Sequence, residues 1–263
     1  MTSQQMRWSD LEPEPGIVDA LEHAGPRPAD GNQNEKRGWS ERFANACAVT
    51  IANELRRLPV LQKKRILPRD LKTGTEPLTP LGAGTSKRID VTVADVLLGL
   101  EIGVSLKGLN FRDVGNGNFD KNLTGRLYEL GDEVRLIHEH LPHAFMAGIF
   151  FLPIEAAADK QKGRSSFAHT VVKLRERTGR LDPALAHHAP RCDIGFVGLY
   201  ATGDEAGGYA RGAVRFLNVM ERPPFRGRPM LESTQSLSEV VEETVARAMD
   251  RVHIDWADPE PDA

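Results

Sequence analysis

The stretch from residue 87 to residue 107, KRIDVTVADVLLGLEIGVSLK, predicts a β-hairpin around which the rest of the fold is arranged. Apolar and polar residues alternate from Ile89 to Val93 and again from Leu100 to Lys107. This period of two is typical of strands that place one set of side chains on each face of a sheet. The hairpin is therefore expected to form the middle of a β-sheet.

The turn of this hairpin is expected at Leu97–Leu98, just before Gly99, which relieves the backbone. Positions whose numbers add up to about 195 then lie opposite each other, with about 5 Å between facing Cβ atoms. Asp90 is expected to face Ser105, and Lys107 lies just beyond. A carboxylate and an ammonium group on one rim of a sheet can bind a divalent cation and a phosphate group.

Helical and extended patterns flank the hairpin on both sides. Apolar residues recur every three to four positions from Ser40, which can cap a helix, to Pro59. A second helical stripe runs from about Lys121 to Leu141, and the apolar run Ala144–Ile154 has the length of a buried strand. Strand, helix and strand of these lengths form a crossover unit, so Ala144–Ile154 is expected to lie parallel to a hairpin strand.

The remaining residues supply the outer layers of the predicted α/β fold. Residues 192–200 and 213–219 have strand patterns, and residues 237–252 have the pattern of an amphipathic helix. The predicted core is a mixed β-sheet of order αββαβ, flanked by helices.

The residues of the hairpin and of the helix before it carry a family resemblance. Asp90 in KRID, Lys107 in SLK and Glu54 in the preceding helix resemble the PD-(D/E)xK nuclease superfamily, the restriction-endonuclease-like enzymes. The resemblance covers about residues 40 to 155. Ser105 stands in the place of the second acid of the motif. Some restriction enzymes of the superfamily also have serine there and take a carboxylate from a later helix; Asp120 and Glu129 are the candidates in this chain.

The resemblance implies a site and a cofactor. Asp90, Lys107, Glu54 and Ser105 are the implied catalytic residues, and Mg²⁺, for which Mn²⁺ can substitute, is the implied metal. Its candidate ligands are Asp90, Glu54, Asp120 and Glu129. The ion would keep several waters, lower the pKa of one of them and screen the phosphodiester charge. Lys107 would offset the charge that grows in the transition state. Glu54 can alternatively pair with a neighbouring arginine at the surface.

Basic residues in three segments are candidate contacts to DNA phosphates. Lys121, Asn122 and Arg126 are at a predicted helix start, where free amides and the helix dipole favour an anion. Lys87 and Arg88 open the hairpin, and Arg164 belongs to a basic stretch between Asp159 and Arg191. The net charge of the whole chain is −3, so an affinity for nucleic acid must come from such local patches.

Length and composition bound the remaining predictions. The 263 residues suit one nuclease-like α/β domain at 39–256, a disordered or loosely docked arm at 1–38 and a flexible acidic tail at 257–263. Two cysteines exclude a disulfide scaffold and favour a cytoplasmic setting. No apolar run approaches the length of a membrane span, so no membrane partner is expected.

The sequence therefore predicts a magnesium-dependent DNA endonuclease with a restriction, defence or repair role. A catalytically inactive nuclease-like module for DNA binding or assembly is the alternative. Ser105 favours this alternative, because it stands in the place of the second acid of the motif. The sequence does not separate DNA from RNA as the substrate. A homodimer is compatible with the resemblance.

Overall fold

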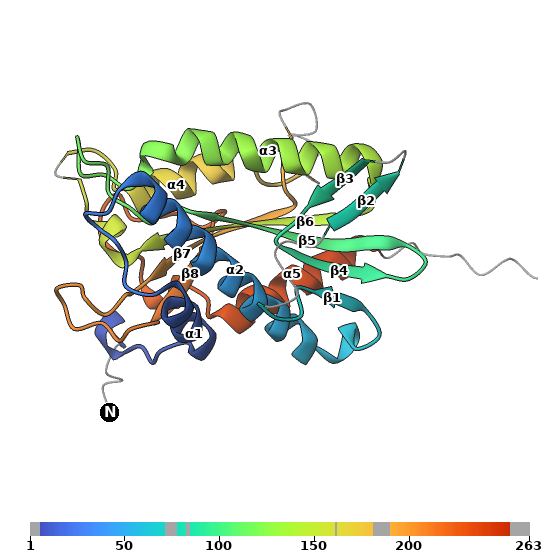
Figure 1. Cartoon of the computed structure of the whole chain (residues 1–263), viewed down its shortest axis with the longest axis horizontal. Coiled ribbons are helices and arrows are strands. Elements are labelled where there is room, and N and C mark those ends of the chain that lie inside the picture. Colours follow the sequence, from blue (N-terminus) through green and yellow to red (C-terminus); the bar gives the residue numbers. More distant parts are fainter. Residues whose placement is uncertain (1–5, 72–77, 83–84, 161, 181–189, 253–263) are drawn as a thin grey trace, which may run out of the picture.

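The computed structural model describes residues 6–71, 78–82, 85–160, 162–180 and 190–252. They form a mixed α/β fold with a six-stranded mixed sheet and helices on both of its faces (Figure 1). The helices are α1 (Pro15–Ala24), α2 (Gln33–Arg57), α3 (Leu123–His140), α4 (Ser166–Arg175) and α5 (Leu237–Val252). The strands are β1 (Arg65–Leu67), β2 (Leu78–Gly82), β3 (Thr85–Arg88), β4 (Val91–Asp95), β5 (Gly99–Gly108), β6 (Phe145–Pro153), β7 (Ile194–Tyr200) and β8 (Val214–Asn218). Short 3₁₀ turns include η2 (Pro59–Leu61) and η3 (Asp120–Asn122).

The sheet has the strand order β1-β4-β5-β6-β7-β8. Strands β5, β6 and β7 are parallel, and the other neighbours are antiparallel. The predicted crossover is confirmed, because α3 connects β5 to its parallel neighbour β6. The strands predicted at 192–200 and 213–219 and the last helix are confirmed as β7, β8 and α5. The order α2, β4, β5, α3, β6 is the predicted αββαβ order, with β1, β2 and β3 inserted after α2.

The register predicted for the hairpin is confirmed over most of its length. Val91 pairs with Val104 and Val93 with Ile102, and Gly99 has a positive φ of 77° after the turn. The register shifts after Val93, so Ala94 pairs with Leu100. The predicted strand is too long at its start: β4 begins at Val91, so Asp90 lies just before it. Residues 85–88 form β3, which pairs with β2 in a separate two-stranded ribbon.

Side chains that alternate between the two faces of the sheet contribute to two apolar layers. On one face the sheet packs against α1, α2 and α5, and on the other against α3 and α4 (Figure 1). Every residue of β6 and β7 is buried, as expected for central strands covered on both faces. Within β5, Val104 and Leu106 face the α2 layer, so the alternation directs Ser105 and Lys107 toward α3.

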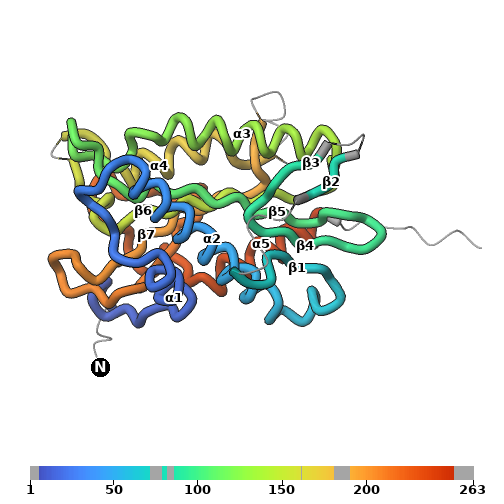
Figure 2. The backbone as a smooth tube through the Cα atoms, in the orientation of Figure 1, coloured from blue at the N-terminus to red at the C-terminus, as the bar shows by residue number. Residues whose placement is uncertain are grey.

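The N-terminal segment differs from the predicted arm. Residues 15–24 form α1, which packs along α2 (Figure 2). Ile17 and Leu21 are buried at four-residue spacing, and the indole of Trp8 donates a hydrogen bond to the carbonyl of Pro229. The short apolar patch of this segment is sufficient to hold α1 in place, because α1 packs on α2, which is already part of the core. The predicted acidic tail at 257–263 lies outside the described residues.

The long helix α2 begins seven residues before the predicted cap at Ser40. Its N-cap is Asn32, whose side chain accepts hydrogen bonds from the amides of Asn34 and Glu35. The carboxylate of Glu35 accepts the amide N–H of Asn32 in return, which completes a capping box. Gly38 is tolerated inside the helix.

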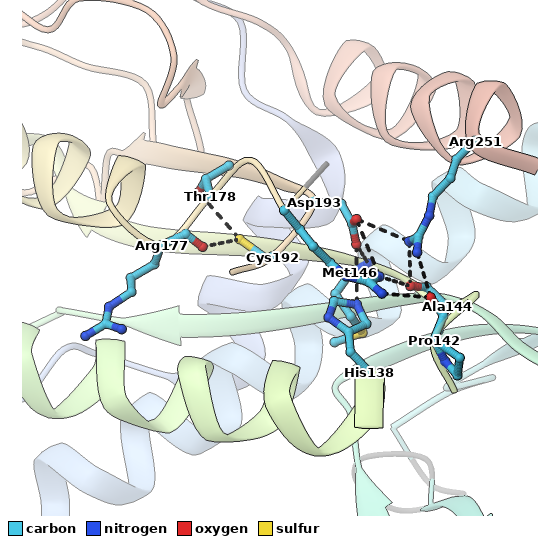
Figure 3. Close-up of polar contacts among 10 residues, drawn as sticks. His138, Pro142, Ala144, Met146, Arg177, Thr178, Cys192, Asp193 and Arg251 are labelled. Atoms are coloured by element: carbon cyan, nitrogen blue, oxygen red, sulfur yellow. Dashed lines mark hydrogen bonds and ion pairs between the residues drawn. The ribbon is translucent and has the colours of Figure 1, made fainter. Parts of the chain in front are cut away.

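A buried carboxylate joins four elements at the start of β6 and β7. Asp193 has no exposed side-chain surface, and it accepts the amide N–H of Met146 at 2.7 Å and Arg251 Nη1 at 3.2 Å (Figure 3). Arg251, from α5, also donates to the carbonyls of Ala144 and Pro142, which follow α3. This network fixes the amino ends of β6 and β7, opposite the end where β5 finishes.

Within the described part of the chain, no helix is both long and apolar enough to cross a membrane. Cys47 and Cys192 are free and buried.

Candidate functional site

A large cavity lies where β5 extends past β4. Val91, the first residue of β4, pairs with Val104, whereas β5 continues to Gly108 with only β6 beside it. The cavity has a volume of about 1030 Å³ and is lined by the first half of α2 and by α3 as far as Glu133. The amide N–H of Leu106, on the open side of β5, donates to Asp90 Oδ2 at 2.5 Å.

Three side chains meet beside this carboxylate. Ser105 Oγ donates to Glu133 Oε2 at 2.5 Å, and Lys107 Nζ donates to both carboxylate oxygens of Glu133, at 3.0 and 3.1 Å. Ser105 has no exposed surface and Lys107 retains 8%. Glu133 comes from α3, toward which the alternation of β5 directs Ser105 and Lys107.

Asp90 and Glu133 belong to one site. Asp90 bonds to the amide of Leu106, and the residues on either side of Leu106 both bond to Glu133. Asp90, Lys107 and Glu133 all line the same cavity. The sequence interpretation did not include Glu133. Its position three residues after Leu130 and just before Val134, on the edge of the buried stripe of α3, was the available signal.

The floor of the cavity contains a buried polar group that the sequence interpretation also missed. Asn110 Oδ1 accepts the hydroxyl of Tyr200 at 3.0 Å, and Asn110 Nδ2 donates to Ser40 Oγ at 3.2 Å. Burial raises the pKa of the Tyr200 phenol, which therefore stays protonated and keeps this donor. Asn110 thus fixes the loop after β5 against α2.

The cavity wall is rich in charge of both signs. The basic residues that line it are Lys36, Arg37, Arg88, Lys107, Arg112, Lys121 and Arg126, and the acidic residues are Glu41, Asp90, Asp113, Glu129 and Glu133. The described residues of the wall therefore have an excess of two positive charges, although the chain carries −3. Lys121 hydrogen-bonds to Asp113 and lowers the pKa of that carboxyl. This cleft suits a polyanion, with the carboxylates of Asp90 and Glu133 beside β5.

Two of the predicted acids lie away from the cavity. Glu54 is on α2, but it pairs with Arg57 and is absent from the cavity wall. It lies nine residues beyond Asn45, the last α2 residue of the wall, which is about 14 Å along a helix. The alternative weighed for Glu54, pairing with an adjacent arginine, is the arrangement that the structure has.

Asp120 belongs to a separate buried network. Its Oδ2 accepts Lys160 Nζ at 2.5 Å and lies 2.6 Å from His169 Nδ1. Burial by itself raises the pKa of Asp120, but the hydrogen bonds from Lys160 and His169 outweigh it, and the pKa is lowered. This network holds η3 against α4, and it is not part of the wall around Asp90.

The remaining predicted residues divide between the cleft and other surfaces. Glu129, Lys121, Asn122, Arg126 and Arg88 line the cavity. Lys87 Nζ lies 3.8 Å from Glu133 Oε1, at the edge of the cluster. Arg164 lies elsewhere, with its guanidinium 5.9 Å from the ring centre of Phe225.

Many basic residues between residues 159 and 191 are engaged in contacts with the protein itself. Arg175 donates to the carbonyl of Val219, Arg180 to that of Pro142 and Arg191 to that of Thr178. Lys173 pairs with Glu176 on α4. These contacts explain why local charge in the sequence did not locate the cleft.

The carboxylates of the cleft are suited to a magnesium ion only if substrate completes the coordination shell. Among the residues whose positions are described, no three His, Cys, Asp or Glu side chains are grouped closely enough to hold a metal. Mg²⁺ nevertheless keeps several waters and is often held by one or two carboxylates together with substrate phosphates. Asp90 and Glu133 supply two such carboxylates, and Glu129 is one helical turn from Glu133.

Comparisons of the chain with protein-family models, with curated proteins and with solved structures found no match. The interpretation of the cleft therefore depends on its own geometry.

Proposed function

We propose that this chain is a magnesium-dependent DNA endonuclease with a restriction-endonuclease-like core. The observation that carries the proposal is the convergence of Ser105, Lys107 and Glu133 beside Asp90 in one basic cleft. The αββαβ order of the core supports it. Glu133 takes the role of the carboxylate that Ser105 cannot supply, in place of Glu54 and Asp120.

Each side chain of the cluster has a proposed role. Asp90 and Glu133 hold Mg²⁺, for which Mn²⁺ can substitute, and Ser105 orients Glu133 through its hydroxyl. When bound, the ion lowers the pKa of a coordinated water and screens the phosphodiester charge. Lys107 holds the scissile phosphate or the attacking water and offsets the negative charge of the transition state.

The walls of the cleft hold the rest of the substrate. Arg88 at the end of β3, Lys121 in η3 and Arg126 in the first turns of α3 line the same cleft as the Asp90 cluster. Arginine and lysine contacts to phosphates position a nucleic acid without reading its sequence. Glu129 is paired with Arg126 at 2.7 Å and is the further carboxylate available to the ion.

A catalytically inactive DNA-binding or assembly module is the second candidate. It is favoured by the hydrogen bonds of Glu133, since both of its oxygens already accept donors from Ser105 and Lys107. If the ion cannot displace these donors, the cleft binds DNA without cutting it.

A plasmid-cleavage assay separates the two candidates. Supercoiled and linear DNA are incubated with Mg²⁺ or Mn²⁺ and wild type, Asp90→Asn, Glu133→Gln or Lys107→Gln, and we expect each substitution to reduce cleavage by about 100-fold or more. Glu54→Gln is the matched control, because it removes a carboxylate from the same fold outside the cleft. Circular dichroism checks that every variant is folded.

Two outcomes would contradict the nuclease proposal. One is cleavage by Glu133→Gln at the wild-type rate. The other is binding of DNA by wild type with no metal-dependent cleavage, which favours the inactive module.

A further inference from the structure

A second cavity, of about 310 Å³, lies at the other end of α2. Its wall comes from the end of α2, from η2 and from β1 and the residues after it. Leu61, Gln62 and Ile66 form part of the wall, and the charged residues are Arg56, Lys64, Arg65 and Arg69. Among the described residues, four basic side chains and no acidic side chain therefore line it, in contrast to the mixed charges of the cleft.

Two of the four cations are fixed by contacts within the protein. Lys64 is paired with Glu101 at 2.7 Å and with Asp95 at 3.1 Å, so its charge is compensated. Arg56 donates to the carbonyls of Ile66 and Pro68, which are neutral acceptors. Burial, followed by the nearby charge of Arg69, lowers the pKa of Arg56. Among the residues that the structure describes, no carboxylate therefore compensates the charge of Arg56.

The other two cations are available to a ligand. Arg65 and Arg69 are exposed, and neither side chain has a hydrogen bond or an ion pair to another residue among those the structure describes. The bonds of Arg56 to the carbonyls of Ile66 and Pro68 hold the segment that carries both residues against α2. The pocket thus presents three uncompensated guanidinium groups around one cavity.

We propose that this pocket is a binding site for a phosphate group. Guanidinium groups donate paired hydrogen bonds that match the oxygens of phosphate, and charge-assisted bonds of this kind are about twice as strong as neutral ones. With four basic side chains and no carboxylate among the described residues of its wall, the pocket suits an anion and not a metal ion. The phosphate is either a small free anion or a group of a nucleic-acid backbone.

The distance along α2 suits the second source. Arg56 lies eleven residues after Asn45, the last α2 residue of the cleft wall, which is about 16 Å of helix. Phosphates of one DNA strand advance about 3.4 Å per nucleotide, so the pocket lies about five nucleotides from the cleft. This second source depends on the proposed nuclease function, whereas the phosphate site does not.

The first experiment is a nuclear magnetic resonance titration with inorganic phosphate at constant ionic strength. We expect saturable shifts of the amide signals of Gln62 and Ile66 in wild type. In the double variant Arg65→Gln/Arg69→Gln the affinity should fall about tenfold or more. The matched control is Arg135→Gln/Arg247→Gln, which removes the same charge from exposed arginines outside both cavities. Equal titrations of the two double variants would overturn the proposal, as would the lack of any shift at Gln62 and Ile66 in wild type.

The second experiment distinguishes the two sources of phosphate. The affinity of Asp90→Asn for a duplex of about 6 base pairs and for one of about 20 is measured with and without the pocket substitutions. A loss for the long duplex alone identifies the backbone as the ligand, and no loss for either supports a small free anion. Because every protein in this second experiment carries Asp90→Asn, cleavage does not enter the result. The phosphate titration of the first experiment involves no nucleic acid, so a failed nuclease proposal leaves it interpretable.

Discussion

At the scale of single residues, Ser105 and Glu133 act as a pair. A serine in the middle of β5 leaves room for the carboxylate of Glu133 to approach the strand, where Lys107 partly neutralises it. Lys107 was expected on a rim of the sheet, but it retains only 8% exposure because α3 covers that face of the hairpin. The ion pair makes its burial tolerable.

Introducing an acid at position 105 is predicted to destabilise the protein. In Ser105→Asp a second carboxylate would stand within hydrogen-bond distance of Glu133, and two such charges cannot both be ionised without cost. We expect a loss of about 2 kcal/mol in the free energy of unfolding relative to Ser105→Ala, measured by urea denaturation.

The exchange variant Ser105→Asp/Glu133→Ser tests the same pairing. It restores one carboxylate at this point, so it should regain the lost stability and more metal-dependent cleavage than Glu133→Ser alone. A double variant no more stable than Ser105→Asp would show that the two positions do not share a site.

At the scale of elements, the hairpin was predictable and the position of α2 against the cleft was not. The pairing of Val91 with Val104 follows from a period of two and the position of one turn. The stripe of α2 shows which face of the helix is buried, but not which of its turns reaches the site. A helix of 25 residues is about 37 Å long, so Glu54 can share the correct face and still lie beyond the cleft.

The same limit explains why the sequence analysis proposed Asp120 and missed Glu133. The sequence indicated that a carboxylate on or near the second helix replaces the missing acid. Which one depends on how α3 is rotated over the sheet, and this depends on packing between distant residues such as Leu130 and Gly148. Asp120 instead holds η3 to α4 and so supports the wall that contains Lys121 and Asn122.

Asp120 is predicted to contribute a pH-dependent part of the stability. Its pKa is lowered from 3.8 in the folded protein, so the contribution is complete above the unfolded value and is lost as the pH falls through the lower folded value. Asp120→Asn removes hydrogen bonds to a charged carboxylate, which should cost about 2 kcal/mol at pH 7. The difference from wild type should shrink as the pH falls below 3.8, because the carboxyl of wild type is then protonated. Denaturation curves over this range measure it; a difference independent of pH would contradict the assignment.

At the scale of the whole molecule, the negative net charge conceals the local excess of basic residues in the cleft. The chain carries −3, but the cleft wall has more basic than acidic residues. Several basic residues of the stretch between residues 159 and 191 contact main-chain carbonyls or carboxylates of the protein itself. The cations of the cleft come from α2, β3, β5, the loop after β5, η3 and α3. Only the fold brings these residues together.

This arrangement predicts how DNA binding depends on salt. Each neutralised phosphate contributes about −0.9 to the slope of log affinity against log salt concentration. Arg88→Gln and Arg126→Gln should each make the slope less steep by about one, whereas Arg164→Gln should leave it unchanged. Fluorescence anisotropy of a labelled duplex with Asp90→Asn as the background gives the slopes. Equal slopes for Arg88→Gln and Arg164→Gln would place the DNA outside the cleft.

The central claim is that Asp90 and Glu133 hold one divalent ion beside Lys107. The most direct measurement is the binding of Mn²⁺, followed by electron paramagnetic resonance, to wild type, Asp90→Asn, Glu133→Gln and the control Glu54→Gln. The account predicts one ion per chain for wild type and Glu54→Gln, and a loss of affinity of about 10-fold or more for the other two variants. Binding by Glu133→Gln as tight as in wild type would contradict it.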